Sequence, residues 1–206
     1  MISTLPWWPD WRGECAAIVA SGASAKAAGV GLLKDRIHVV AIKRTVELCP
    51  WADVVYGCDE PWWTSVDGLP TFRGVKLTQA HAAAQKYKMP RIEVKNIDKI
   101  LTDEPAVVGS GGNSGFQALN LAVQFGATGI LLVGFEMQGE HWYGRNTWQR
   151  SSNPISTNFD RWIKAFHGVA DDLKHRGIDV VNASTTSAVK GFRRATIAQA
   201  LEGWGL

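Results

Sequence analysis

Mostly apolar runs of strand length alternate with stretches of helical periodicity along the chain. The runs lie at residues 16–20, 37–42, 53–56, 129–134 and 178–182, with a weaker one at 91–97. The stronger runs do not alternate strictly between apolar and polar positions, which is typical of strands buried on both faces of a parallel sheet. The pattern therefore predicts a parallel sheet that helices cover on both sides.

Helical periodicity is strongest at residues 157–176, where large apolar side chains recur every three or four positions. These side chains are Phe159, Trp162, Ile163, Phe166, Val169 and Leu173. Gly177 follows where helices commonly end with a glycine. The other predicted helices are a short one that ends near Leu33, and those at 78–86, 114–125 and 194–203. The order of elements predicts an α/β fold with a doubly wound, mostly parallel, Rossmann-like sheet, which binds ligands beyond the carboxyl ends of its strands.

The chain of 206 residues is long enough for one domain with a substantial core, and no linker-like segment divides it. We therefore expect a single Rossmann-like domain at 1–206, with a tryptophan-rich arm at 1–14 and a lid-like insertion at 137–156. Hydrophobic residues make up 46% and charged residues 20%, as in globular proteins. No apolar run is long enough to cross a membrane and the N-terminus lacks the features of a signal peptide, so we expect a cytoplasmic protein.

Charge and cysteine content narrow the classes of partner. The net charge of +3, from 22 basic and 19 acidic residues, is too mild to indicate a nucleic-acid partner. Cys15, Cys49 and Cys58 have no CxxC spacing, so the sequence predicts reduced thiols and neither a disulfide framework nor a metal site. Several of the ten tryptophans lie in polar or proline-rich segments, where they are candidates for stacking on a ligand or forming a partner surface. These are Trp7, Trp8, Trp11, Trp62, Trp63, Trp142 and Trp148.

Candidate ligand-binding residues follow the first three predicted strands. After the first strand, Gly22 permits a tight turn between Ser21 and Ser24, and Ser24 can cap a helix whose N-terminus attracts phosphate. A plain connecting turn is the alternative. Lys43 follows the second strand as a phosphate contact or as a solvated charge. Asp59 follows the third strand, and its carboxylate is either part of the site or the N-cap of a helix.

A glycine-rich turn precedes the predicted helix at 114–125. Residues 109–115 contain four glycines in seven positions, which lets several backbone N–H groups point to one place. Gly112, Asn113, Ser114 and Gly115 are therefore candidate nucleotide-binding residues. The strand that follows this helix ends at Glu136, which we expect at the same sheet edge as the other candidates.

The segment at 137–156 has no apolar periodicity, and connections of this length inside a domain are commonly functional. His141 suits proton transfer near neutral pH and is the first candidate for a catalytic residue. Tyr143 and Arg145 suit the binding of phosphate oxygens. The segment is therefore predicted to be a lid that carries catalytic groups.

Five segments carry a resemblance that spans nearly the whole chain. They are IVASGASAK, VVAIKRT, ADVVYGCDEPWW, GGNSGFQALNLAVQFGATGILLVGFEM with EHWYG, and DVVNASTTSAVKGF. Together they resemble a group of tailed-phage and prophage proteins. More distantly the chain resembles bacterial sialyltransferases of glycosyltransferase family 42, and archaeal-type hydroxymethylpterin pyrophosphokinases, in which two loops of a Rossmann-like domain hold a nucleotide.

The resemblance assigns positions in this chain to those two nucleotide loops. Ser21, Gly22 and Ser24 correspond to the first loop, Asn113, Ser114 and Gly115 to the second, and Glu136 takes the place of an aspartate. Two departures accompany the match. Lys43 stands where the relatives have a nucleotide-contacting asparagine, and the segment RSSNPIST lacks the catalytic histidine of the sialyltransferases.

Three functions follow as hypotheses. The first is a metal-independent, sialyltransferase-like glycosyltransferase that uses a nucleotide-sugar as substrate and no further cofactor. In it, His141, Tyr143 and Glu136 form the catalytic group, His141 is the general base, and Tyr143 and Arg145 stabilise the leaving phosphate. The second is a pyrophosphokinase-like phosphotransferase in which Asp59 and Glu136 position Mg²⁺ for ATP. The third is a catalytically degenerate phage accessory or interaction protein. The acceptor and any homo-oligomer stay open, and the expected location is the host cytoplasm.

Overall fold

The central sheet contains seven strands in the order β4-β3-β2-β1-β7-β8-β9, and every neighbouring pair is parallel. The computed structural model describes residues 5–184 and 186–206, so the first four residues of the predicted arm lie outside the described residues. The strands are β1 (Cys15–Val19), β2 (His38–Ile42), β3 (Val54–Tyr56), β4 (Val75–Leu77), β7 (Gly129–Val133), β8 (Asp179–Asn182) and β9 (Arg193–Arg194). A separate parallel pair joins β5 (Glu93–Lys95) to β6 (Val107–Gly109).

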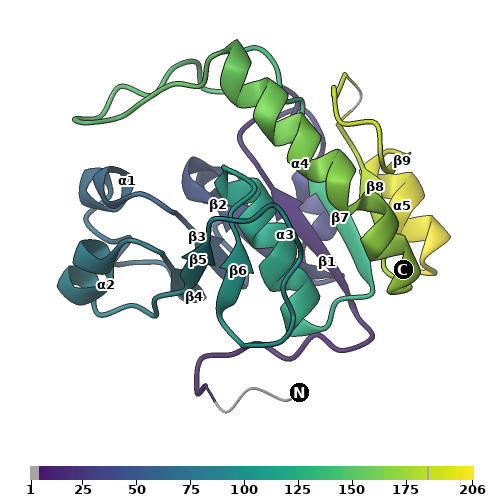
Figure 1. Ribbon diagram of the computed structural model, residues 1–206, viewed down its shortest axis with the longest axis horizontal. Coiled ribbons are helices and arrows are strands. Elements are labelled where there is room, and N and C mark those ends of the chain that lie inside the picture. Colours follow the sequence, from purple (N-terminus) through teal and green to yellow (C-terminus); the bar gives the residue numbers. More distant parts are fainter. Residues whose placement is uncertain (1–4, 185) are drawn as a thin grey trace.

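The described part of the chain has five α-helices and two short 3₁₀ helices, of which all but the C-terminal α5 lie between strands. They are η1 (Val30–Leu33), η2 (Lys43–Glu47), α1 (Glu60–Ser65), α2 (His81–Tyr87), α3 (Ser114–Phe125), α4 (Ser156–His175) and α5 (Ile197–Gly203). Figure 1 shows α3 and α4 together over one face of the sheet. The segment between β7 and α4 extends from there across the molecule toward α1 (Figure 1).

Both faces of the sheet are buried, and the strand residues divide between two apolar clusters. Ala16 and Ile18 of β1 belong to the cluster that contains apolar side chains of α3 and α4. Ala17 and Val19 point the other way, into the cluster that contains side chains of η1, α1 and α5. Since successive strand side chains face opposite sides, burial on both faces requires apolar residues at every position. The predicted doubly wound α/β fold is confirmed.

The strand order places a topological switch between β1 and β7. From β1 the chain builds outward through β2, β3 and β4, and it then returns to add β7, β8 and β9 on the other side. The connections that leave β1 and β7 therefore diverge to opposite faces and open a crevice at the carboxyl ends of these two strands.

Several elements differ from the sequence prediction. The helix predicted to end near Leu33 is only the one-turn η1, because Gly29 enters it with a left-handed φ of 76° and the preceding residues form turns. The strand predicted at 91–97 shortens to β5 and lies outside the central sheet. The sequence prediction missed β4, β6, β9 and α1, each of which has six residues or fewer and too few positions to establish a period.

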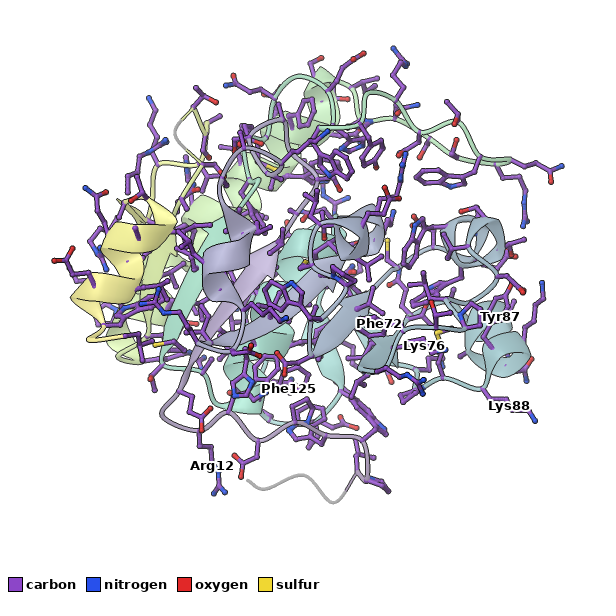
Figure 2. All side chains as sticks on the ribbon, turned by 180° about the vertical axis from the view of Figure 1, so that it is seen from behind. Arg12, Phe72, Lys76, Tyr87, Lys88 and Phe125 are labelled. Carbon is purple, nitrogen blue, oxygen red and sulfur yellow. The ribbon has the colours of Figure 1, made fainter. Side chains whose placement is uncertain are left out.

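The N-terminal arm packs under α3. Trp8 and Trp11 both contact Phe125 edge-on, with ring centroids 4.8 Å apart in each pair. Figure 2 shows Phe125 within the molecule and Arg12 at its lower edge, with the Arg12 side chain pointing outward. The arm thus closes the core. Of the helices in residues 5–184 and 186–206, none has the length and apolar character that a membrane crossing requires.

Candidate functional site

A cavity of about 620 Å³ opens at the carboxyl edge of the sheet, over the switch between β1 and β7. Its floor consists of the turns after β1, before α3 and after β7, and Lys43, Cys58 and Asp59 form one wall. Residues of the lid segment, between 137 and 154, and of the first turns of α4 complete the lining. This volume is in the range typical of small-molecule sites.

The turn before α3 presents a helix N-terminus to the cavity. The Asn113 side chain accepts a hydrogen bond from the Phe116 N–H at 2.9 Å, and this cap fixes the start of the helix. The N–H groups of Ser114 and Gly115 have no acceptor within the helix, because they belong to its first turn. Both residues line the cavity, so the positive end of α3 points into it, where it favours an anion.

Gly112 and Gly115 are required for the shape of this turn. Gly112 has a left-handed φ of 73°, which glycine adopts without strain. A Cβ on Gly115 would lie 2.7 Å from the Phe135 ring, so only glycine lets the helix start pack this closely on the turn after β7.

The turn after β1 differs from the sequence prediction. Ser24 does not cap a helix, because no α-helix follows it, and its hydroxyl instead donates to Glu136. The Gly22 N–H is also occupied, since it donates to the Gly134 carbonyl at 2.9 Å. Ser21 and Gly22 line the cavity, whereas Ser24 lies behind it. This turn therefore contributes Ser21 and the backbone of Gly22 to the cavity lining, and it does not contribute a helix N-terminus.

Glu136 is buried beneath the first turn and is only 2% exposed. One carboxylate oxygen accepts from Ser24, and the other has no hydrogen-bond partner within the described residues. A Cβ on Gly22 would lie 1.6 Å from that second oxygen. Glu136 is not among the residues that line the cavity. The geometry therefore indicates that it positions the first turn, and not that it contacts a substrate.

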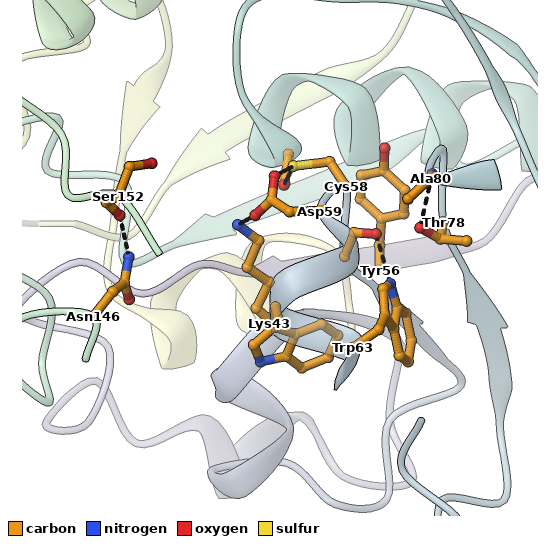
Figure 3. A network of polar contacts seen from close by, with 12 residues as sticks. Lys43, Tyr56, Cys58, Asp59, Trp63, Thr78, Ala80, Asn146 and Ser152 are labelled. Carbon is orange, nitrogen blue, oxygen red and sulfur yellow. Dashed lines mark hydrogen bonds and ion pairs between the residues drawn. The ribbon is translucent and has the colours of Figure 1, made fainter. Parts of the chain in front are cut away.

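A polar network occupies the wall of the cavity (Figure 3). The Lys43 ammonium group forms a salt bridge with Asp59. The Cys58 thiol donates to Asp59 at 2.7 Å, and the Ser114 hydroxyl donates to the Cys58 sulfur at 3.0 Å. Asp59 occupies the N-cap position of α1 but makes no capping hydrogen bond there, because its carboxylate faces Lys43 and Cys58 instead.

The protonation states in this network follow from burial and neighbouring charge. Burial raises the pKa of Cys58 to about 11, so this thiol is protonated near neutral pH. Burial opposes the charges on Lys43 and Asp59, but each is favoured by the opposite charges around it. The pKa of Lys43 is consequently raised and the pKa of Asp59 lowered. At neutral pH the pair is ionised.

The lid places His141 and Tyr143 at the cavity, stacked with ring centroids 5.0 Å apart. His141 forms an isolated antiparallel bridge with Gly22, and the Trp142 N–H donates to the Ser21 carbonyl at 3.0 Å. Arg44 lies 4.2 Å from the Tyr143 ring centroid. These contacts attach the start of the lid to the turn after β1.

Burial, followed by the positive charge of Lys43, lowers the pKa of His141 from its usual 6.5. A neutral imidazole therefore faces the cavity near neutral pH and can accept a proton. Burial raises the pKa of Tyr143, which stays protonated and can donate a hydrogen bond. Its hydroxyl donates to Asn146 of the lid at 2.8 Å.

The structure brings most of the predicted nucleotide-binding residues to the cavity. Ser21, Gly22, Lys43, Asp59, Gly112, Asn113, Ser114, Gly115, His141 and Tyr143 all line it. Arg145 is exposed and, like Ser24 and Glu136, lies outside the lining. Of the tryptophans considered for stacking, Trp11, Trp62 and Trp63 are buried in the core, whereas Trp148 lines the cavity.

Phe159 and Trp162 also line the cavity, although the sequence analysis identified them only as part of the apolar stripe of the helix at 157–176. They begin the apolar stripe of α4, but only the later part of that stripe, from Ala165 onward, is buried against the sheet. The sequence could have identified them by their position directly after the long lid. There an amphipathic helix extends past the edge of the sheet that it covers.

Within residues 5–184 and 186–206, no three His, Cys, Asp or Glu side chains come together as a metal site. Comparisons with protein-family models, with curated proteins and with solved structures found no match to this chain. The case for a function therefore depends on the cavity and its residues.

Proposed function

We propose that this protein binds a nucleotide-sugar in the cavity and transfers the sugar to an acceptor hydroxyl without a metal ion. The observation that carries the proposal is the convergence on one cavity of the α3 N-terminus, the Lys43 ammonium group and a neutral His141. The first two suit the phosphates of a nucleotide-sugar, and the third suits activation of a hydroxyl.

The proposed reaction is a displacement at the anomeric carbon of the sugar. His141 accepts the proton of the acceptor hydroxyl as the acceptor oxygen forms its bond to that carbon. The bond from carbon to the phosphate oxygen breaks, and its electron pair leaves with the phosphate. The N–H groups of Ser114 and Gly115, together with Lys43, stabilise the charge that develops there. The Tyr143 hydroxyl joins them by turning its proton from Asn146 to the phosphate. Arg145, expected in this role from sequence, is exposed and does not line the cavity.

The aromatic side of the cavity suits the sugar and the acceptor. Phe159 and Trp162 of α4 and Trp148 of the lid supply the aromatic lining, and Trp162 lies beside Gly112 in the turn before α3. Aromatic faces offer apolar area to the C–H groups of a ring while polar groups in the lid remain available for hydroxyls. The proposed setting is the host cytoplasm, and the protein surface or glycan that accepts the sugar stays unassigned.

The proposal predicts that His141→Ala removes transfer and leaves nucleotide binding largely intact. Loss of a general base typically lowers a rate by roughly a hundred- to ten-thousandfold. Mass spectrometry of reactions with a panel of CMP-, UDP- and GDP-sugars and mixed acceptors, in the presence of a chelator, measures the products. His175→Ala at the exposed C-terminal end of α4 is the matched control.

The same residue sets the expected pH dependence. Because the pKa of His141 is lowered, its neutral form persists below pH 6.5, so the acid limb of kcat/KM should fall with a midpoint below that value. A profile with an acid midpoint above 6.5, or full transfer by His141→Ala, would contradict the assignment. If none of the nucleotides binds at millimolar concentration by calorimetry, the whole proposal fails.

The Mg²⁺-dependent phosphotransferase hypothesis finds less support in the geometry. It needs Asp59 and Glu136 together at a metal, but Asp59 faces Lys43 and Glu136 is buried under the first turn. ATP binding that depends on magnesium and disappears in Asp59→Asn would favour that hypothesis over sugar transfer. The degenerate-domain hypothesis predicts an occluded crevice, whereas a cavity of about 620 Å³ is open at the strand ends.

A further inference from the structure

The Lys43 ammonium group is held inside the cavity by a single carboxylate. The Lys43 side chain is 19% exposed, and the Asp59 side chain that binds it is 44% exposed. Both line the cavity, and Figure 3 shows the ammonium group directed at Asp59. Asp59 has access to water, which can solvate its carboxylate when the salt bridge breaks. The Lys43 side chain is less exposed than that of Asp59, so its charge needs another anionic partner when Asp59 is displaced.

The backbone around Lys43 fixes the direction of its side chain. Lys43 has a left-handed φ of 51°, which non-glycine residues adopt only when the surrounding structure enforces it. The Thr45 hydroxyl enforces it by donating to the Val19 carbonyl at 2.7 Å and accepting from the Ile42 N–H at 2.8 Å. The end of β2 is thus tied to the end of β1, and the lysine points into the crevice between the two glycine-containing turns.

We propose that Lys43 is the fixed cation of this site and Asp59 its displaceable counter-ion, so that the cavity selects phosphate-bearing anions without a divalent cation. The incoming phosphate takes the place of Asp59 on the ammonium group, and the Asp59 carboxylate turns to solvent. One salt bridge is exchanged for another, and the α3 N–H groups add to the second. That the anion is part of a nucleotide-sugar rests on the proposed function. The exchange itself needs only a phosphate group.

Two substitutions of opposite sign test the exchange. Calorimetric titration with inorganic pyrophosphate, in buffer that contains a chelator, measures the dissociation constant. Lys43→Met should weaken binding by roughly ten- to a hundredfold, which is the usual effect of losing a charge-assisted hydrogen bond. Asp59→Asn should tighten binding by roughly fivefold or more, because the phosphate no longer competes with a carboxylate for Lys43.

Lys34→Met is the control for net charge. It removes one positive charge, as Lys43→Met does, but Lys34 is exposed and lies before β2, at the opposite end of the strand from Lys43. Its dissociation constant should match that of the unchanged protein. Thermal melts verify that each variant is folded, and if Lys43→Met does not fold, the tightening in Asp59→Asn remains a sufficient test, since a structural role for Asp59 predicts weakening.

Three results would overturn the inference: equal pyrophosphate binding in Lys43→Met and the unchanged protein, weaker binding in folded Asp59→Asn, or binding only when Mg²⁺ is added. The proposed function fails separately. Chelator-resistant, Lys43-dependent pyrophosphate binding without sugar transfer would refute the transferase and leave the counter-ion exchange standing. Sugar transfer by the unchanged protein, together with pyrophosphate binding that is the same with and without Lys43→Met, would refute the counter-ion exchange and leave a transferase that does not depend on Lys43.

Discussion

Gly22 determines how closely the first turn packs on the residues after β7. Its missing side chain leaves the space that a carboxylate oxygen of Glu136 occupies, and its N–H donates to the Gly134 carbonyl. A methyl group at this position cannot be relieved by a small rotation, since it would also lie 2.5 Å from that backbone carbonyl. The turn after β1 and the turn after β7 therefore pack directly against each other.

Gly22→Ala should accordingly lower the free energy of unfolding by about 1–3 kcal/mol, as overpacking commonly does. Urea denaturation measures the change, and calorimetry should show weaker nucleotide binding because Ser21 shifts with the turn. Gly168→Ala is the matched control, since nothing lies within 4 Å of its Cβ and it is exposed in α4. The free energy of unfolding of Gly168→Ala should rise by about 0.5–1 kcal/mol. Equal stability of the two variants would show that the packing at Gly22 is not tight.

Helix α3 is the element on which the proposed anion binding depends most. Its N-terminus lies at the cavity, and its C-terminal Phe125 is anchored by Trp8 and Trp11 of the arm. Asn120 also holds the preceding loop, by accepting from the N–H groups of Leu101 and Gly109 at 2.9 Å each. The helix is thus fixed at both ends before any ligand arrives, so binding costs little further ordering.

The cap at Asn113 can be tested separately from the ligand. Asn113→Ala should cost about 1 kcal/mol in the free energy of unfolding, whereas Asn113→Ser retains a capping oxygen and should stay close to the unchanged protein. Chemical denaturation of the two variants measures the difference. If serine and alanine prove equally destabilising, the side-chain cap does not fix the start of α3.

Sequence patterns predicted the long elements and the second turn well. The helix expected at 114–125 has those bounds in the structure, and α4 differs from its predicted bounds by one residue at each end. The predicted cap at Ser24 was wrong, because the Ser24 hydroxyl bonds to Glu136, which lies 112 positions further along the chain. The helical stretch predicted to end near Leu33 is reduced to the single turn η1. The burial of Glu136 and the salt bridge of Lys43 also depend on tertiary contacts, which local periodicity cannot predict.

At the scale of the whole molecule, the strand order decides where a ligand can bind. The switch between β1 and β7 puts residues from distant parts of the chain around one opening, including Ser21, Lys43, Asp59, Ser114 and His141. A second cavity of about 550 Å³ lies at the other end of the strands, near His38 and Trp204. None of its described lining residues belongs to the N-terminus of an α-helix, and it lies at the amino ends of β1 and β2. The account therefore assigns the ligand to the first cavity alone.

Backbone amide shifts during a nucleotide titration test this assignment most directly. ¹⁵N–¹H correlation spectra recorded with increasing CMP or UDP, in the presence of a chelator, report each N–H group separately. The account predicts that the largest saturable shifts occur at Ser114 and Gly115, with further shifts at Ser21, Lys43 and the lid. Shifts confined to His38, Trp204 and their neighbours, or no saturable shift with any nucleotide, would contradict it.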